Sequence, residues 1–521
     1  MDGMRAKKGG KRMYAFADRY LRVFGVVLFC LGLTVTPIRA ETLRVAAGGV
    51  PPSLGNPYTA TALPATELWL AIFDGLTRLD WRGGPLPGLA LSWDNPTPLT
   101  WRFTLRDNLA FHNGKAMTAE SVAKVFTFLL GEDAASFLVA RELTNIAEVV
   151  AVDPQTVQFN LRTPDAILPK RLSLVMIVDL DSWKERGVDE FTIAPVGSGP
   201  YRLVDWGAGN TAARLVAFYD SWRAPRGYDE LEYRVVGNKT SRLQALYGDQ
   251  VDIATGLSED DVGDVKANGY APYVTATTQI KSIALPNVRY GDHPLKDQRV
   301  RQALNYAVDK HAIAEVILGG WVNVASQGAV SGISGFNPDL QPYPYDPARA
   351  RRLLTEAGYS DGIDLEIEFV ATLTPLDPVL FQKVAQDLNI VGVRTSVRQI
   401  PFSDYLRKYV PNQWGDVDAF GLFWNSATFQ DAIRPFEYFS CFRVNPFFCD
   451  EDVTADIRAV QTMADPAERE TKMQAIMAKF HALAPAIWIT NSAYVNATRR
   501  GISNFRMGPS GIVFEELEPT P

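Results

Sequence analysis

Residues 91–122 of this chain read LSWDNPTPLTWRFTLRDNLAFHNGKAMTAESV. Within them, Thr100–Leu105 alternates apolar and polar residues, which is typical of a strand with one buried face. The polar stretch Arg106–Gly114 predicts a turn. Thr118 then stands where a helix N-cap is expected, because apolar residues follow it at helical spacing and Gly131 ends the pattern. The apolar residues of this predicted helix are Val122, Val125, Phe126 and Leu129.

The alternation of strands and helices continues along the rest of the chain. Glu41–Ala47 and Ser282–Leu285 have strand patterns, while Leu68–Leu79 has the pattern of a helix. Residues 300–307 place Val300, Ala303, Leu304 and Ala307 on one helical face. Strands that alternate with helices throughout predict an α/β fold.

Composition excludes several classes of protein. The chain has 521 residues, of which 47% are hydrophobic and 21% charged, so a disordered, collagen-like or coiled-coil protein is excluded. This length predicts two to four domains. Residues 1–40 hold eight Lys and Arg against two Asp, and subtracting that +6 from the overall −7 leaves −13 for the remainder. An acidic body argues against a general nucleic-acid binder.

The basic N-terminus has the order of a secretory signal. Seven Lys and Arg within residues 1–22 precede the 13-residue apolar run Val23–Val35, which is shorter than the ~20 residues of a membrane span. We expect cleavage after Ala40 and Sec export, since no twin-arginine pair is present. An uncleaved anchor is the alternative. Cys30 leaves a lipid anchor open, although Phe29 stands where a small residue is expected.

Two cysteines remain after removal of the leader. Cys441 and Cys449 frame the short segment CFRVNPFFC, and in an exported chain this spacing predicts a local disulfide. Two buried free thiols are the alternative. Metal binding is not expected, because no histidine lies within the loop.

No motif for catalysis stands out. The four histidines, at positions 112, 293, 311 and 481, form no HExxH pair, and the chain has no G-x-S-x-G elbow, Walker A sequence or G-x-G-x-x-G. This favours a binding protein over an enzyme. We expect no cofactor and no resident metal.

Five stretches together resemble the family 5 extracellular solute-binding proteins of ABC transporters, which include dipeptide, oligopeptide and nickel binders. They occur in the order of that family and span nearly all the chain after the leader. The five are residues 91–122, 195–206 (PVGSGPYRLVDW), 300–310 (VRQALNYAVDK), 345–359 (YDPARARRLLTEAGY) and 420–426 (FGLFWNS).

The resemblance implies a two-lobed periplasmic-binding-protein fold (type II, cluster C-like) with an extra small domain and a ligand cleft between the lobes. It predicts a discontinuous domain I at 41–75, 195–272 and 485–521. Domain II is expected at 76–194, and domain III, the opposing lobe, at 273–484. Hinge closure is the expected motion.

The same resemblance proposes ligand-binding residues. In peptide-binding relatives, an aspartate three positions after the tryptophan equivalent to Trp424 pairs with the ligand ammonium, but Ala427 stands there in this chain. Asp431 matches a later aspartate of the family and is the candidate to replace it. Trp424 is expected to stack on a ligand or to serve in the core. The other candidates are Asn425 and Ser426 for hydrogen bonds, Tyr58 in an early loop, and Arg141 for a carboxylate.

These expectations define a function. The chain is predicted to be a periplasmic binding protein that captures a small solute, a peptide or peptide-like ligand, and delivers it to an inner-membrane ABC permease and ATPase complex. A monomer is expected, with no nucleic acid partner. An opine, an oligosaccharide and a metal chelate stay open as ligands, and a secreted α/β hydrolase or a sensory binding protein are the alternatives of another class.

Overall fold

The computed structural model describes residues 41–61, 65–288, 291–370, 376–409, 417–442, 446–463, 465–509 and 511–520. The chain divides into Met1–Glu41 and one compact unit, Thr42–Pro521. The predicted signal peptide, with its cleavage site at Ala40 and with Cys30, lies outside the described residues. Among the described residues, none of the helices combines the length and the apolar character that crossing a bilayer requires.

A ten-stranded mixed sheet runs through the compact unit in the order β10-β11-β12-β1-β13-β18-β14-β17-β15-β16. The sheet contains both parallel pairs, such as β1 with β12 and β15 with β16, and antiparallel pairs, such as β11 with β12 and β14 with β18. With its helices, this sheet confirms the predicted α/β class. The strands are β1 (Thr42–Ala47), β10 (Tyr201–Asp205), β11 (Ala212–Ala217), β12 (Glu230–Val235), β13 (Ile253–Leu257), β14 (Ala271–Ala284), β15 (Ile363–Val370), β16 (Val393–Ile400), β17 (Ala419–Asn425) and β18 (Ala486–Thr498).

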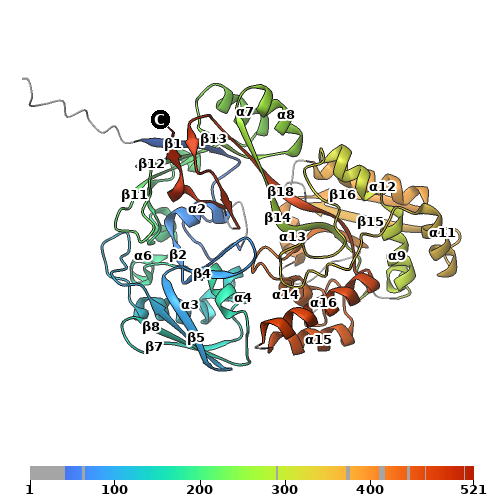
Figure 1. Ribbon diagram of the computed structural model, residues 1–521, viewed down its shortest axis with the longest axis horizontal. Helices are drawn as coiled ribbons and strands as arrows, with labels where there is room; N and C mark the ends of the chain where they lie inside the picture. Colours follow the sequence, from blue (N-terminus) through green and yellow to red (C-terminus); the bar gives the residue numbers. More distant parts are fainter. Residues whose placement is uncertain are drawn as a thin grey trace, which may run out of the picture. The chain divides into compact units, whose positions relative to one another are not determined.

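Two hydrophobic cores lie along this sheet, and we call the residues packed around them the first lobe and the second lobe. The long strands β14 and β18 lie side by side and extend from one lobe to the other (Figure 1). Their antiparallel pairing runs from Ala271 opposite Thr498 to Ala284 opposite Ala486, with an irregularity between Ala276 and Ile280. Two paired strands that connect two cores are the structure about which lobes can rotate.

The first lobe contains a second, four-stranded sheet in the order β5-β6-β8-β7. The strand predicted at Thr100–Leu105 is β6, and the helix predicted after Thr118 is α3. Thr118 and Ser121 form a capping box at its start, which confirms the expected N-cap. The elements are α2 (Ala65–Ile72), β5 (Ala90–Thr97), β6 (Thr100–Leu105), α3 (Ala119–Leu129), α4 (Leu138–Arg141), β7 (Ile146–Ala151), β8 (Thr156–Leu161), α5 (Leu168–Arg171) and α6 (Leu180–Ile193).

The second lobe is formed mainly by helices packed against the β14–β17–β15–β16 end of the large sheet. These helices are α9 (Gln298–Ala307), α10 (Lys310–Ala312), α11 (Pro347–Glu356), α12 (Asp377–Ile390), α13 (Phe402–Tyr409), α14 (Ile433–Tyr438), α15 (Glu451–Gln461) and α16 (Pro466–Leu483). A smaller core surrounds α7 (Lys239–Tyr247) and α8 (Val262–Ala267), beside β13 and β18.

Short strands complete the described fold. They are β2 (Asp74–Gly75), β3 (Thr77–Leu79), β4 (Pro85–Pro87), β9 (Met176–Ile177), β19 (Ile502–Ser503), β20 (Met507–Gly508), β21 (Gly511–Ile512) and β22 (Glu518–Pro519).

Two predicted elements have different bounds from those expected. The helix predicted at 68–79 ends at Ile72, because Arg223 donates to the carbonyl oxygens of Leu70 and Phe73 and the chain then turns into β2. The short strand predicted at 282–285 is the end of β14, which begins at Ala271. The first half of β14 reads APYVTAT and has no clear alternation of apolar and polar residues, and its strand conformation depends on pairing with β18.

The first core bears on the predicted boundary between domains I and II, which stays a prediction. The first core mixes residues from both expected domains, for example Leu43 and Tyr201 with Phe103 and Phe126. The two expected domains therefore share one hydrophobic core in the first lobe.

The predicted disulfide between Cys441 and Cys449 is present. We expect Cys441→Ser, Cys449→Ser and the double variant each to lower the free energy of unfolding by about 2–3 kcal/mol. The bond joins residues eight positions apart and so reduces the conformational entropy of the unfolded chain. Urea unfolding with and without reductant measures this difference. The double variant should be insensitive to reductant. A wild-type protein with equal stability in both conditions would contradict the prediction.

Candidate functional site

Trp424, near the end of β17, lies inside the second core. Its side chain is fully buried, its ring stacks on Phe439 with 4.0 Å between centroids, and Phe480 and Trp488 contact it edge-on. The backbone of Gly328 approaches so closely that a methyl group there would lie 2.3 Å from the indole Nε1. Of the two roles expected for Trp424, its contacts favour the core role, because protein groups surround the indole.

Asn425 and Ser426 shape the turn that follows β17. The Oδ1 atom of half-buried Asn425 accepts a hydrogen bond from the Ala427 backbone N–H at 2.9 Å. The hydroxyl of buried Ser426 donates to the carbonyl oxygen of Gly328 at 3.4 Å. Both side chains therefore have structural partners, and the amide NH₂ group of Asn425 is the group best suited to a ligand hydrogen bond.

Asp431 is a fully buried carboxylate with two positive partners. Arg469 binds both of its oxygens, with N–O distances of 3.0 and 3.1 Å, and the Lys170 ammonium lies 3.0 Å from Oδ2. The Ile433 backbone N–H also donates to Oδ1. Burial alone would raise the pKa of Asp431, but Arg469 and Lys170 outweigh it and hold the pKa at about 2. The charge of Asp431 is thus already compensated.

Lys170 belongs to α5 of the first lobe, so its ion pair with Asp431 crosses to the second lobe. Two further ion pairs cross beside it. Arg171 binds Asp165 of its own lobe at 2.8 Å and Glu437 of α14 at 3.1 Å. Arg434 of α14 binds Glu142, which directly follows α4, at 3.2 Å. These contacts hold the two lobes together on one side of β14 and β18.

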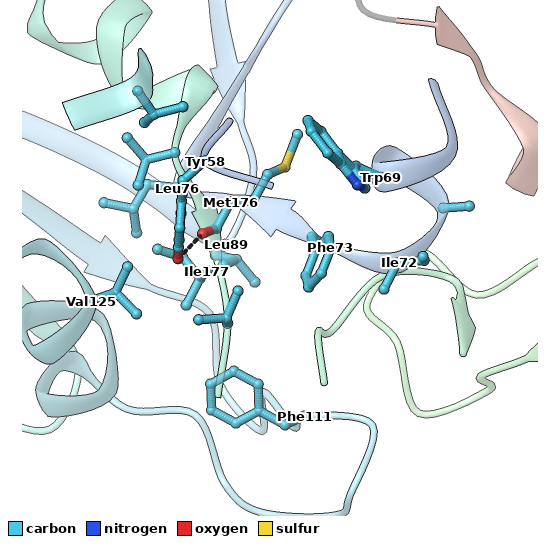
Figure 2. Close-up of a cluster of buried hydrophobic side chains, with 14 of the residues drawn as sticks. Tyr58, Trp69, Ile72, Phe73, Leu76, Leu89, Phe111, Val125, Met176 and Ile177 are labelled. Carbon is cyan, nitrogen blue, oxygen red and sulfur yellow. Dashed lines mark hydrogen bonds between the residues drawn. The ribbon is translucent and has the colours of Figure 1, made fainter. Parts of the chain in front are cut away.

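Tyr58 lies in the first core. Its side chain is fully buried against Phe137 and Trp183, and its hydroxyl donates to the Met176 carbonyl oxygen at 3.0 Å (Figure 2). Burial raises the pKa of Tyr58. The structure therefore gives Tyr58 a core position with its polar group already bonded. Arg141, by contrast, is exposed at the end of α4.

At the end of β17, one edge of the strand has no strand partner among the described residues. β15 pairs with β17 only through Ile367–Phe369 against Ala419–Gly421. On that side, no strand of the described chain pairs with Leu422–Asn425. A small cavity lies against this edge, with Lys281 of β14 and Asp377 of α12 in its wall. Its volume of about 10 Å³ is room for about one water molecule.

Lys281 and Asp377 form a buried ion pair at this cavity. Their side chains are each 6% exposed, and the Nζ–Oδ1 distance is 2.6 Å. The Lys281 ammonium also lies over the Phe423 ring, 5.5 Å from its centroid. A buried ion pair and an aromatic ring therefore lie together beside this end of β17.

Sequence reasoning did not find Lys170, Arg171, Arg469, Lys281 or Asp377. The Lys170-Arg171 pair inside the apolar stretch 167–178 was a usable signal, because adjacent cations in such a stretch need acidic partners. The others are far apart in sequence from the residues they bind, so no local pattern marks them.

The described residues offer one group of possible metal ligands, Cys441 with Cys449 and Glu451. The two sulfur atoms are joined to each other in the disulfide, so this group does not provide thiolate ligands.

Two cores that share one sheet, two connecting strands and a charged seam between lobes define a two-lobed solute-binding protein. The family model described as bacterial extracellular solute-binding proteins, family 5 Middle, matches residues 84–445. This chain belongs to that family, as its motifs indicated.

Relatives cover nearly the whole chain. A glutathione-binding protein from Pectobacterium atrosepticum is 25% identical, over 96% of this chain and 98% of its own length. The dipeptide-binding protein of Escherichia coli is 25% identical, over 91% of this chain and 94% of its own. Among solved structures, the periplasmic binding protein DppA from Helicobacter pylori has a TM-score of 0.78 at 20% identity, covering 94% of this chain and 100% of its own. This structural likeness confirms the two-lobed fold.

Proposed function

We propose that this protein is the periplasmic binding component of an ABC importer, which captures a peptide or peptide-like solute between its lobes and delivers it to the permease and ATPase complex. Family membership supports the binding role. Relatives named as glutathione- and dipeptide-binding proteins support the solute class, as do solved relatives in complex with the peptide STSA and with Met-Leu.

The observation that carries the peptide assignment is that, on the side of β15, no strand among the described residues pairs with Leu422–Asn425 of β17. A peptide is the solute that can satisfy a strand edge, because its backbone N–H and C=O groups alternate with the same spacing. The side chains of Phe423 and Asn425 flank this edge and are half-buried. They would contact the side chains of a bound peptide.

Capture requires the lobes to separate. The cavity beside the edge holds about one water molecule, so a peptide enters only in a conformation with more space. Rotation about β14 and β18 provides that motion, and the ion pairs from Lys170, Arg171 and Arg434 re-form on closure. A solute that contacts both lobes shifts the population toward the closed form.

A different solute class has one specific observation in its favour. Ala427 provides no carboxylate, and that of Asp431 is already bound by Arg469 and Lys170. A solute without a free peptide amino terminus, such as an opine, an oligosaccharide or a metal chelate, does not need these groups. The solved relative AgaA holds agropinic acid, at 22% identity and a TM-score of 0.78. No comparable observation favours the hydrolase alternative, since the family is one of solute-binding proteins.

The native protein should carry its solute through purification, because a solute enclosed between lobes leaves slowly. Mass spectrometry of the denatured preparation identifies the solute, and a thermal-shift screen with dipeptides and tripeptides checks it. A peptide at 100 times its Kd should raise Tm by about 2–3 °C for a chain of this size. Stabilisation by sugars, opines or chelates alone would reject the peptide assignment.

A further inference from the structure

Trp222 of the first lobe is surrounded by guanidinium groups. The guanidinium of Arg106 lies over its ring, 4.1 Å from the centroid, and that of Arg78 lies over the ring at 5.0 Å. Arg223 is the next residue along the chain. Arg78 belongs to β3, Arg106 directly follows β6, and Trp222 lies between β11 and β12. Three segments that are distant in the sequence therefore bring these half-buried side chains together.

The carboxylates near this cluster are bound by Arg223. Its Nε donates to Oδ1 of Asp74 at 2.6 Å, and its Nη1 donates to Oε1 of Glu515 at 2.8 Å. Its Nη2 donates to the carbonyl oxygens of Leu70 and Phe73. Both carboxylates are therefore held by Arg223, and each nitrogen of that guanidinium has an acceptor.

Arg78 and Arg106 have no carboxylate of their own. Across the part of the chain that the structure describes, neither of them takes part in an ion pair. Arg106 donates from Nε to the Gly88 carbonyl oxygen at 2.7 Å. The Nε atom of Arg78 and the Nε1 atom of Trp222 are buried, and neither finds a hydrogen-bond acceptor among the described residues. Two buried N–H donors that need an acceptor thus lie in one cluster.

The cluster also has an excess of positive charge. The guanidinium groups of Arg78, Arg106 and Arg223 lie with two carboxylates, those of Asp74 and Glu515, so the net charge is +1. Burial and the charge of Arg223 lower the pKa of Arg78, although Glu515 and Asp74 oppose this shift. A guanidinium that is partly removed from water without an anionic partner is costly, and a bound anion offsets that cost.

We propose that this cluster is a binding site for a phosphate group, which accepts hydrogen bonds from the Arg78 guanidinium and the Trp222 indole, with the charge of Arg106 beside them. A phosphate has several acceptor oxygens, so it can serve donors from two side chains at once. A neutral acceptor would complete the hydrogen bonds but leave the excess charge. The phosphate can belong to a free anion or to the headgroup of an anionic lipid.

This site is distinct from the proposed solute capture. Its residues all belong to the first lobe, and none of them takes part in the ion pairs that Lys170, Arg171 and Arg434 form between the lobes. The inference therefore adds a second ligand to the protein, and it does not depend on which solute is captured.

Calorimetric titration of the purified protein with inorganic phosphate tests the site, at an ionic strength held constant with sodium chloride. We expect saturable binding to the wild type. Arg78→Gln should weaken it by at least about tenfold, because a charge-assisted hydrogen bond is lost. Trp222→Phe keeps an aromatic ring but removes the N–H group, and should weaken binding by about two- to tenfold. Arg82→Gln, at an exposed position between β3 and β4, should leave it unchanged.

Vesicles distinguish the two sources of the phosphate group. Cosedimentation with phosphatidylcholine vesicles that contain phosphatidylglycerol, lost in Arg78→Gln and displaced by inorganic phosphate, would support the site and assign it to a lipid headgroup. Arg78-dependent binding of inorganic phosphate without binding to these vesicles would support the site and assign it to a free anion.

Thermal unfolding provides a second readout. At constant ionic strength, phosphate should raise the Tm of the wild type and of Arg82→Gln, but not that of Arg78→Gln. If Arg78→Gln does not fold, Trp222→Phe and Arg106→Gln provide the same test. A wild type that binds neither phosphate nor the vesicles would overturn the proposal, and so would binding that none of the three substitutions weakens. Either result leaves the proposed import function standing.

Discussion

Asp431→Asn is expected to lower the free energy of unfolding by about 3–5 kcal/mol. The substitution leaves Arg469 and Lys170 buried without their shared negative partner, with side-chain exposures of 8% and 14%. A buried cation that loses its partner keeps its full desolvation cost, and the remaining amide compensates little of it. Urea unfolding at neutral pH measures the difference.

The matched control is Asp339→Asn, because Asp339 is exposed and belongs to the same lobe. It should change stability by less than about 0.5 kcal/mol. An effect of Asp431→Asn equal to that of the control would show that the three charges do not interact in solution.

The pH dependence of stability provides an independent check on Asp431. Its pKa is lowered from 3.8 to about 2, so its ionised form favours the folded state. This contribution, about 2 kcal/mol, is present above pH 4 and is lost as the pH falls from about 4 to about 2. Asp431→Asn should remove that part of the curve while leaving the acid response of the other carboxylates.

Trp424→Ala is expected to cost about 3–5 kcal/mol of unfolding free energy. Its indole is fully buried between Phe439, Phe480 and Trp488, and truncation opens a cavity that rigid aromatic neighbours fill poorly. Thermal and urea unfolding measure the loss, with Trp81→Ala, at a position 36% exposed, as the control. An unchanged stability would contradict the core role assigned to Trp424.

Gly328 supplies a companion test of the same packing. Gly328→Ala should cost about 1–3 kcal/mol in the wild type, because its methyl group would lie 2.3 Å from the indole Nε1. In a Trp424→Phe background, which removes that nitrogen-bearing ring, the same substitution should cost less. Additive effects would show that the two residues do not contact.

The sequence by itself predicted much of the local structure. Thr118 and its capping box, the strand at 100–105 and the Cys441–Cys449 disulfide depend on residues close together in the chain, so their patterns are visible locally. The motifs at 91–122 and 300–310 also indicated the family correctly. The cap, the strand pattern and the disulfide depend on interactions of short range.

Only the tertiary structure decided which polar residues face one another. Asp431 was expected to be a ligand partner, but it is bound by Lys170, 261 positions away, and by Arg469. Tyr58 was expected in the cleft and lies in the first core, since its loop folds against Trp183. Burial and ion pairing are sums over neighbours from distant segments, so they follow from the three-dimensional packing and not from spacing along the chain.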